Sequence, residues 1–223
     1  MMDCESVLGL SYMKILDKNN WNRKEHFEFF SRYDNPFFGL VTEVDCTKAY
    51  ELSKQAGVSF FAYYLYQSIT AANQIEEFKY RIQGSDVVVF DEIHAASTLG
   101  RKDGTFAFSF MPFSNDFTIF KQSLHKEMEA VAQSTGLRAN EEAYRADVIH
   151  YSSLPWNKFT GLTHARSFNT NDSVPKISFG KAYWQGEQFI LPIAIDVHHG
   201  LVDGFHVAKY LEAFQALLGK TDC

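Results

Sequence analysis

The stretch DVHHGLVDGFH, from Asp196 to His206, joins two regular elements near the end of the chain. The run before it, QFILPIAI, is apolar and rich in β-branched residues, which is typical of a buried strand. The run after it, HVAKYLEAFQALL, repeats apolar residues at the spacing of an amphipathic helix. Gly200 and Gly204 suit a tight turn between them. Three histidines and two aspartates therefore gather at one strand-to-helix corner.

Three interpretations of this corner are possible: a metal site, a structural role and a general base. A metal site needs converging ligands, but the adjacent His198 and His199 point to opposite sides of a strand, and HHxxxD lacks the HExxH spacing of zinc hydrolases. A structural role needs no further partner. In the third interpretation, one histidine acts as a general base on a substrate hydroxyl or thiol. Asp203, four residues after His199, would then hold the backbone or anchor an arginine from elsewhere.

The composition excludes several classes of protein. The chain of 223 residues has a net charge of -6, so it carries no basic field for nucleic acid. The 46% of hydrophobic and 16% of aromatic residues argue against disorder, and the aromatic side chains fill a core, line a pocket or bury a subunit interface. No apolar run approaches the roughly 20 residues of a membrane helix. We therefore expect a globular protein that associates with itself and not with membranes.

The cysteines and the first residues predict the compartment. Cys4, Cys46 and Cys223 lie far apart, in no spacing typical of a metal site. We therefore expect free thiols in a reducing compartment. The start, MMDCESVLGL, lacks the basic residues and the long apolar centre of a signal peptide. Together these features predict a cytoplasmic protein.

Strand and helix patterns alternate along the chain without strict βαβ order. Asn20 is the expected cap of the first helix, Thr47 and Gly57 the expected start and stop of the second, and Asp116 and Gly136 those of the fourth. This mixture predicts a single α/β domain over residues 1–223, with a mixed β-sheet and packed helices. The expected strands are 11–16, 35–45, 78–82, 86–93, 105–111, 147–154 and a hairpin over 176–197 that turns at Gln185-Gly186; the expected helices are 20–33, 47–56, 59–75, 116–135 and 206–218.

Three separated motifs resemble those of one known family. HHGLVDGFHVAKY is similar to the C-terminal signature HHxxxDGFH of chloramphenicol acetyltransferases, and ILPIAIDVHH fits their LPLxxxVHH lead-in. WNRKEHFEFF matches the family's WxRxEHFEF segment, and YSSLPW matches its SxLPW strand. The motifs agree in order and spacing, and the resemblance extends from about Tyr12 to Leu218. On these motifs the chain is identified as a member of the family.

The resemblance implies a fold and a reaction. The fold is that of the CoA-dependent acyltransferases, and the co-substrate is acetyl-CoA, with no metal. The enzyme transfers the acetyl group to a hydroxyl of chloramphenicol, or of a similar alcohol, in a ternary complex without an acyl-enzyme intermediate. The family also implies a homotrimer with active sites at the subunit interfaces, where the catalytic histidine of one subunit faces a pocket formed largely by its neighbour.

The resemblance also assigns catalytic roles to four residues. His199, the second histidine of the pair, is the general base. Asp203 forms a buried ion pair with Arg23, the arginine of WxR, and this pair holds the backbone of the active site. Ser152 donates a hydrogen bond to the oxyanion; its neighbour on the strand points to the opposite face. His198 and His206 are expected to have structural roles.

The residues expected to bind substrates include several departures from the family. Phe30 stands where the family has a tyrosine, Pro36 where it has a cysteine, and His164 where it often has a leucine. A pocket that becomes more polar in this way binds a flat nitroaromatic ring less well. The expected acceptor-binding residues are Phe29, Phe30, Phe38 and Phe106; the expected cofactor-binding residues are Ser178, which replaces a threonine, Lys181 and Tyr183.

Other functions fit parts of the same pattern. An acyltransferase of the same fold with another hydroxyl or thiol acceptor would keep all four catalytic residues, whereas a silent binding module would have no reason to keep them. The acyltransferase core of 2-oxoacid dehydrogenase complexes shares HxxxDG but carries lipoyl and linker regions. A hydrolytic metalloenzyme would lose activity to chelators. The sequence offers no account of Asp196, which stands where the family has glutamine.

Overall fold

The structure is a computed structural model that describes residues 12–166 and 172–220. The expectations for the first residues, for Cys4 and for Cys223 lie outside these ranges. The third cysteine, Cys46, is buried and free, and burial raises the pKa of its thiol. Across the described ranges, no helix combines the length and the apolar character that crossing a membrane requires.

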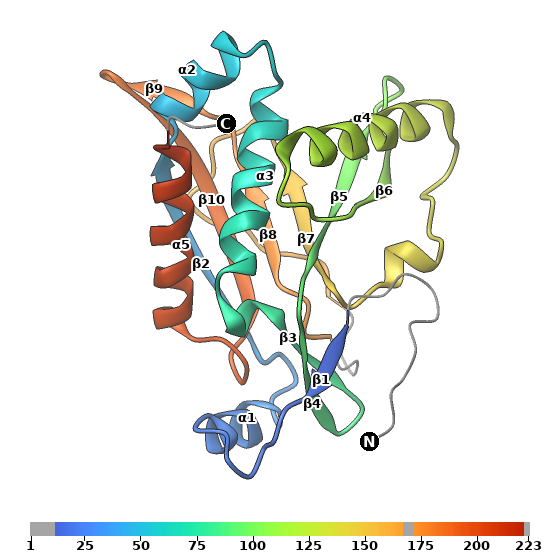
Figure 1. Ribbon diagram of the computed structural model, residues 1–223, viewed down its shortest axis with the longest axis vertical. Helices are drawn as coiled ribbons and strands as arrows, with labels where there is room; N and C mark the ends of the chain where they lie inside the picture. Colours follow the sequence, from blue (N-terminus) through green and yellow to red (C-terminus); the bar gives the residue numbers. More distant parts are fainter. Residues whose placement is uncertain (1–11, 167–171, 221–223) are drawn as a thin grey trace.

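Strands and helices mix along the chain as the sequence predicts (Figure 1). Two 3-10 turns, Glu76–Lys79 and Glu141–Tyr144, complete the regular structure of the described residues. The strands are β1 (Met13–Ile15), β2 (Phe37–Asp45), β3 (Tyr80–Gln83), β4 (Asp86–Phe90), β5 (His94–Gly100), β6 (Phe106–Met111), β7 (Val148–Ser153), β8 (Lys176–Phe179), β9 (Tyr183–Gln185) and β10 (Gln188–His198); the helices are α1 (Lys24–Phe30), α2 (Thr47–Gln55), α3 (Phe60–Asn73), α4 (Phe117–Gln133) and α5 (Gly204–Leu218).

The larger sheet has the strand order β2-β10-β8-β7-β5-β6, and β9 pairs with β10 beside it. β7 runs parallel to both β5 and β8, whereas the other pairs of this sheet are antiparallel. The predicted mixed sheet is therefore confirmed. β1, β4 and β3 form a separate small antiparallel sheet. The long strand β10 contains the apolar run QFILPIAI and ends at His198, within the strand-to-helix corner.

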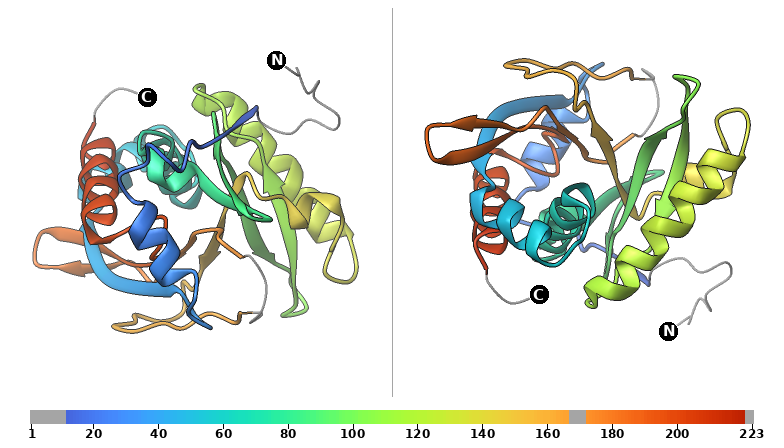
Figure 2. Two further views of the ribbon diagram at one scale, coloured as in Figure 1. Left: turned by 90° about the horizontal axis from the view of Figure 1, so that it is seen from below. Right: turned by 90° about the horizontal axis from the view of Figure 1, so that it is seen from above.

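The helices cover one face of the larger sheet and leave part of the other face open. Figures 1 and 2 show α3 and α5 side by side over this covered face, with α4 against β5 and β6. Alternate residues of β10, such as Ile193, Ile195 and Val197, join the core beneath the helices. On the opposite face, which we call the open face, Phe106 and Phe108 of β6 are 47% and 37% exposed.

Two expectations about local structure are wrong. α1 begins at Lys24 and not beside Asn20, whose side chain instead donates a hydrogen bond to Asp17 in the preceding turn (Nδ2 to Oδ2, 2.6 Å). The sequence pattern also omitted β5, HAASTLG, because its small and polar residues lack a strong apolar alternation. β5 lies between β6 and β7, and its pairing with both neighbours makes it a strand despite this weak local signal.

Candidate active site

The corner after β10 is held by a reciprocal cap at the start of α5. The Asp203 carboxylate accepts hydrogen bonds from the backbone N–H groups of Phe205 (3.0 Å) and His206 (3.4 Å). In return, Nδ1 of His206 accepts from the backbone N–H of Asp203 (3.1 Å). Such a capping box satisfies donors that the first turn of a helix leaves unpaired. His206 is thus engaged in fixing the helix start, which agrees with a structural role.

Arg23 ties the N-terminal segment to this corner. Its Nη1 lies 2.5 Å from Oδ2 of Asp203, and its Nη2 donates to the backbone carbonyl of His199 (3.2 Å). Only 9% of the Arg23 side chain is exposed. Burial acts to raise the pKa of Asp203, but the hydrogen bond and charge of Arg23, together with His206, outweigh it and lower that pKa. One guanidinium therefore binds the helix cap and the backbone of the predicted base.

The His199 imidazole is clamped between two aromatic rings. Phe30 stacks on it with ring centroids 4.0 Å apart and an interplanar angle of 10°, and Phe38 packs at 4.6 Å. Nδ1 of His199 is buried and has no hydrogen-bond partner within the described ranges. The opposite nitrogen, Nε2, is therefore the one that can exchange a proton with a substrate. Both phenylalanines belong to the predicted acceptor-binding set, and both lie against the predicted base.

His198 faces the other way and closes the turn. Its Nδ1 accepts from the backbone N–H of Gly200 (3.1 Å), and burial lowers its pKa to about 4. The ring is thus neutral at neutral pH and acts as an acceptor. A Cβ on Gly200 would lie 3.0 Å from this ring and 3.3 Å from the Cα of Phe27, so the turn leaves no room for a side chain there. This arrangement agrees with a structural role for His198.

Ser152 lies on the open face, in the middle of the sheet. Its Oγ is 3.4 Å from Oγ1 of Thr98, a neighbour that the sequence pattern did not single out because β5 itself was missed. The next residue, Ser153, points to the helix side and contacts the Tyr64 hydroxyl (3.1 Å). The two serines thus point to opposite faces, as expected for neighbours on a strand.

Ser152 and His199 are far apart within one chain. Ser152 pairs with Ser178 on β8, which pairs with Ala194 on β10, five residues before His199. Two strand spacings across the sheet and five residues along a strand give about 19 Å between their Cα atoms. The chain therefore brings together Arg23, Asp203, His199, Phe30 and Phe38, but it does not bring Ser152 to this group.

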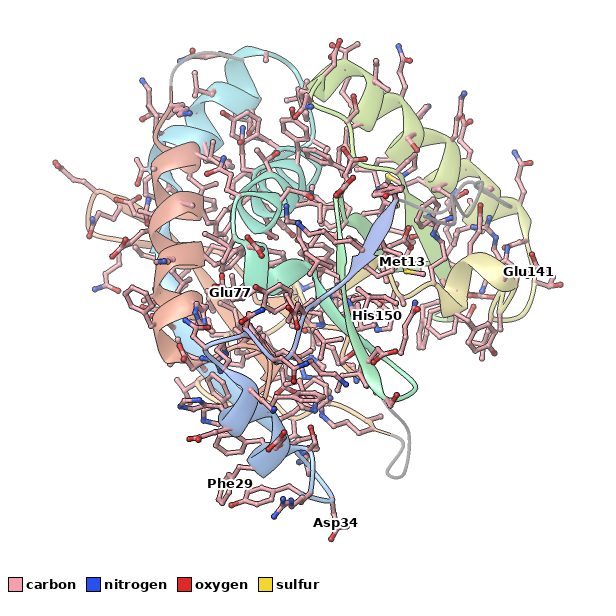
Figure 3. The ribbon with its side chains drawn as sticks, turned by 60° about the horizontal axis from the view of Figure 1, so that its bottom comes forward. Met13, Phe29, Asp34, Glu77, Glu141 and His150 are labelled. Atoms are coloured by element: carbon pink, nitrogen blue, oxygen red, sulfur yellow. The ribbon has the colours of Figure 1, made fainter. Side chains whose placement is uncertain are left out.

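The remaining predicted acceptor residues lie away from His199. Phe29 is 54% exposed, and Figure 3 shows it at the outer end of α1, pointing away from the body of the chain. Phe106 begins β6 on the open face and packs on Phe108, with ring centroids 6.2 Å apart. Pro36 accepts a hydrogen bond from the backbone N–H of His199 (2.8 Å), so the residue at the family's cysteine position contacts the predicted base through its carbonyl.

A polar cluster on the open face surrounds Asp196. His164 contacts Ser178 through Nε2 (2.9 Å) and Asp196 through Nδ1 (3.2 Å). Arg166 donates to the same oxygen of Asp196, Oδ2, and its guanidinium stacks on Phe37. Burial acts to raise the pKa of Asp196, but the hydrogen bonds from His164 and Arg166 lower it, so the carboxylate stays ionised. These partners explain the charge for which the sequence offered no account.

Two large cavities adjoin other predicted site residues. The first, about 860 Å³, is lined by Phe60, Phe61 and Tyr64 of α3, by residues 98–103 and by Trp156. Gly180 and Ala182 also line it and flank the predicted cofactor residue Lys181. The second, about 500 Å³, lies under residues 161–164 against β2 and β10. Of the other predicted cofactor residues, Tyr183 donates its hydroxyl to Glu43 (2.6 Å), and Ser178 contacts His164.

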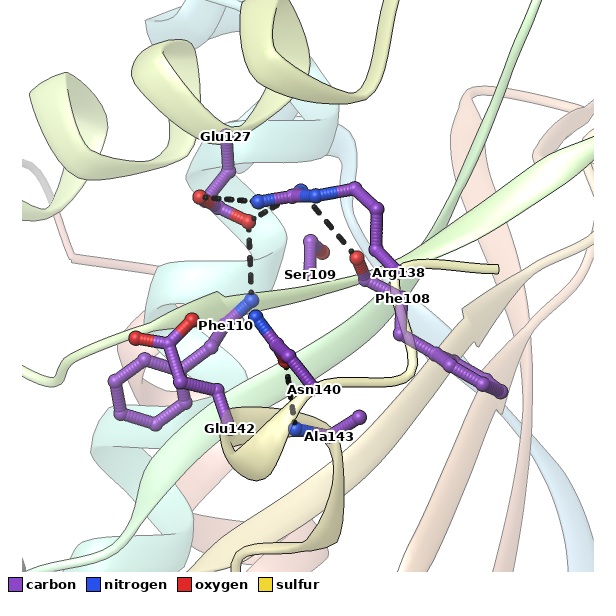
Figure 4. A pocket seen from close by; sticks show the side chains of 8 residues that line it. All are labelled: Phe108, Ser109, Phe110, Glu127, Arg138, Asn140, Glu142 and Ala143. Atoms are coloured by element: carbon purple, nitrogen blue, oxygen red, sulfur yellow. Dashed lines mark hydrogen bonds and ion pairs between the residues drawn. The ribbon is translucent and has the colours of Figure 1, made fainter. Parts of the chain in front are cut away.

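Within the described residues, neither a metal cluster nor a third cavity offers another site. Among the described residues, no group of three or more His, Cys, Asp or Glu side chains is placed to hold a metal ion. A further cavity of about 10 Å³ lies between α4 and β6 (Figure 4). There Arg138 pairs with Glu127 (2.9 Å), and Glu127 accepts from the backbone of Phe110. This cavity has room for about one water molecule and is too small for a substrate. The ion pair beside it connects α4 to the segment after it.

Three comparisons place this arrangement among known proteins. The family model described as chloramphenicol acetyltransferase matches residues 10–215. The chain is 30% identical to a chloramphenicol acetyltransferase of Campylobacter coli over 95% of this chain and 100% of that protein. It is 28% identical to chloramphenicol acetyltransferase 3 of Escherichia coli over 93% of this chain and 97% of that protein.

The solved structures agree with the sequence relatives. One of a chloramphenicol acetyltransferase matches with a TM-score of 0.87 and 33% identity, over 93% of this chain and 100% of that one. A probable dihydrolipoamide acetyltransferase from Listeria monocytogenes matches with a TM-score of 0.61 and 11% identity, over 87% of this chain and 88% of that one, and so shares the fold alone. On the family model and these near-complete matches, the chain belongs to the chloramphenicol acetyltransferase family and is an acyltransferase of that family.

Proposed function

We propose that the chain transfers the acetyl group of acetyl-CoA to a hydroxyl of chloramphenicol or a similar alcohol, with His199 as the general base. The observation that carries this proposal is the anchoring of His199: Arg23 holds its carbonyl while Phe30 and Phe38 fix its ring. A base held in this way has Nδ1 sealed in protein, which leaves Nε2 for the substrate. We further propose that residues 1–223 form one acetyltransferase domain.

The reaction follows from the groups in place. Nε2 of His199 accepts the proton of the acceptor hydroxyl as the oxygen attacks the thioester carbonyl. The carbonyl oxygen becomes negatively charged, and the Ser152 hydroxyl donates a hydrogen bond to it. When the C–S bond breaks, the imidazolium returns its proton to the leaving thiolate of CoA. The acetyl group thus passes directly to the acceptor, without a bond to the protein.

The separation of His199 from Ser152 supports an active site shared between subunits. One side chain cannot span the distance of about 19 Å between the two positions, so a second copy has to supply the missing half. Phe106 and Phe108 expose apolar surface on the open face that carries Ser152, and such surface favours association. We propose a homotrimer in which each active site joins His199 of one subunit to Ser152 of the next.

The larger cavity is the proposed binding site of acetyl-CoA. Its apolar lining of Phe60, Phe61 and Trp156 suits the pantetheine arm and the adenine ring. It reaches Thr98, whose hydroxyl lies beside that of Ser152. Lys102 in the lining and Lys181 beside it are the proposed partners of the CoA phosphates.

Thiol release from acetyl-CoA tests the activity directly. Addition of chloramphenicol is expected to raise the rate of CoA release, and a chelator is expected to leave that rate unchanged. If another alcohol raises CoA release and chloramphenicol does not, the drug is the wrong acceptor and the acyltransferase proposal stands. If no alcohol raises the rate of CoA release, the proposal as a whole fails.

The variant Ser152→Ala tests the oxyanion donor and the shared site together. Loss of one such donor is expected to lower kcat by about 10²–10³-fold, measured as thiol release. Subunits carrying Ser152→Ala alone and His199→Ala alone, unfolded together and reassembled, should regain activity. In randomly mixed trimers, one site in each mixed assembly is intact, which gives about a quarter of wild-type activity. Mixed assemblies that stay as inactive as the parents would contradict the shared site.

A second candidate, an acyltransferase of this family with a different acceptor, is favoured by one observation. The open face carries the linked His164, Ser178 and Asp196 instead of an apolar wall. An acceptor rich in apolar surface gains little from such groups, because they must be desolvated to bind it. The test with several alcohols therefore decides between the two candidates.

A further inference from the structure

The mechanism leaves one cluster of titratable side chains unused. Ser178, His164 and Asp196 form a continuous line of contacts from β8 through the segment before residue 167 to β10. The two spacings, 2.9 and 3.2 Å, are those of a Ser-His-Asp triad. Ser178, however, is only 1% exposed, and His164 contacts its hydroxyl. A nucleophile needs access to its substrate, and the Ser178 hydroxyl has none. The contacts among Ser178, His164 and Asp196 therefore fix the position of a side chain.

Asp196 is the side chain that the cluster fixes. An ionised carboxylate only accepts hydrogen bonds, so the contact with His164 places a proton on Nδ1 of that ring. Both His164 and Arg166 contact the same oxygen, Oδ2, which sets the plane of the carboxylate. The guanidinium of Arg166 is in turn fixed by its stacking on Phe37. Asp196 is thus held from one side by two donors.

The other carboxylate oxygen borders the cavity of about 500 Å³. Gly39 and Asp196 both line this cavity, and they face each other across the β2–β10 pair. A Cβ on Gly39 would lie 3.7 Å from Oδ1 of Asp196, so glycine leaves the space beside this oxygen uncovered. The rest of the lining consists of residues 161–164, of Leu40 and Val41 on β2, and of Ala194 and Ile195 on β10. A fixed acceptor oxygen therefore faces a volume large enough for a small molecule.

The local charge balance selects the kind of group that this oxygen would bind. Arg166, with 8% of its side chain exposed, lies beside both Asp196 and Asp172. Lys176 also pairs with Asp172 (3.2 Å), so two cations balance two carboxylates. A neutralised carboxylate gains little from a cationic ligand but remains a strong acceptor of hydrogen bonds. The cavity thus suits neutral hydroxyl groups.

We propose that Asp196 determines the acceptor, so that this enzyme favours an alcohol with several hydroxyl groups, such as a hexopyranoside, over a nitroaromatic alcohol. The inference rests on the proposed acetyltransferase function and names the substrate class of its acceptor site. The Asp196 cluster lies on the open face that carries Ser152, because Ser178, which His164 contacts, pairs with Ser152 across β7 and β8. In the proposed trimer, His199 of the neighbouring subunit meets this face. Oδ1 of Asp196 accepts a hydroxyl of the acceptor body, while a different hydroxyl reaches His199.

The test compares two acceptors in wild type and in Asp196→Ala. Thiol release is measured with chloramphenicol and with methyl β-galactopyranoside as acceptors. Wild type is expected to give the higher kcat/KM with the sugar. Asp196→Ala should lower that value about tenfold or more, mainly through KM. The bound sugar hydroxyl would lose its hydrogen-bond acceptor, and an unpaired polar group in a binding site is costly. The variant should lower kcat/KM for chloramphenicol by a clearly smaller factor, because no hydroxyl preference is lost with that acceptor. Asp196→Glu, which keeps the carboxylate, should retain part of the preference.

Asp172→Asn is the matched control, because Asp172 pairs with the same arginine but does not line the cavity. Its ratio of the two kcat/KM values should equal that of wild type. The inference is overturned if wild type prefers chloramphenicol, if Asp196→Ala lowers both activities equally, or if it changes only the oligomeric state seen by size-exclusion chromatography. If neither alcohol raises thiol release, the acetyltransferase proposal itself fails, which is a different result from a lost preference.

Discussion

Replacing His199 by alanine is expected to lower kcat by about 10³–10⁴-fold, near the upper range for the loss of a general base. His199 is the proposed base at this corner, whereas Nδ1 of both His198 and His206 accepts a hydrogen bond from a backbone N–H group. The KM for acetyl-CoA should change little, because the cavity proposed to bind it does not include His199. Steady-state thiol release measures both parameters.

Two controls separate this effect from a loss of folding. His125→Ala removes an imidazole that is mostly exposed on α4 and should keep wild-type kinetics. The melting temperature of His199→Ala should stay close to that of wild type, because the Arg23 contact at this position is to the backbone carbonyl, which alanine retains. A folded His199→Ala variant with full activity would exclude the proposed mechanism.

Replacing Arg23 by methionine is expected to produce the largest loss of stability. Removing one partner of a buried ion pair costs about 3–5 kcal/mol, and because a third of the Asp203 side chain is exposed we expect about 2 kcal/mol. For a chain of this size that corresponds to a fall in Tm of about 4–8 °C, measured by calorimetry. Activity should fall as well, because the carbonyl of His199 loses its donor.

The pH dependence of this loss follows from the sign of the shift. The pKa of Asp203 is lowered in the folded state, so its ion pair stabilises the protein above the ordinary value of 3.8, and this contribution is lost as the pH falls through the folded pKa. The difference in unfolding free energy between wild type and Arg23→Met should therefore be constant from pH 7 to 5 and should narrow below about pH 4. If the difference in unfolding free energy instead grew as the pH fell, its pH dependence would come from a group other than Asp203.

The sequence predicted the parts of the site that local patterns encode. The β10–α5 corner, its glycines and the Asp203 cap follow from residues that are neighbours along the chain. The Arg23–Asp203 pair could be predicted only through the family resemblance, because its members are 180 residues apart. Local pattern also failed for β5, whose character depends on the strands at its sides.

The chemistry of Asp196 shows a second limit of sequence reasoning. Its partners His164 and Arg166 come from a segment without regular structure, about thirty residues away, which no periodicity places beside β10. The packing of Phe30 on His199 was likewise invisible: the sequence showed only that a hydroxyl was missing at this position, whereas the structure shows a ring that fixes the imidazole. In both cases long-range contacts give the residue its role.

The distance between Ser152 and His199 has a consequence for how activity arises in a cell. If each half of the site belongs to a different subunit, a newly made chain is inactive until it meets its copies. The rate of acetylation would then rise faster than in proportion to the amount of chain when the chain is scarce, and linearly once assembly is complete. Weak expression would thus give less product per chain than strong expression, and dilution would lower the activity without unfolding the subunits.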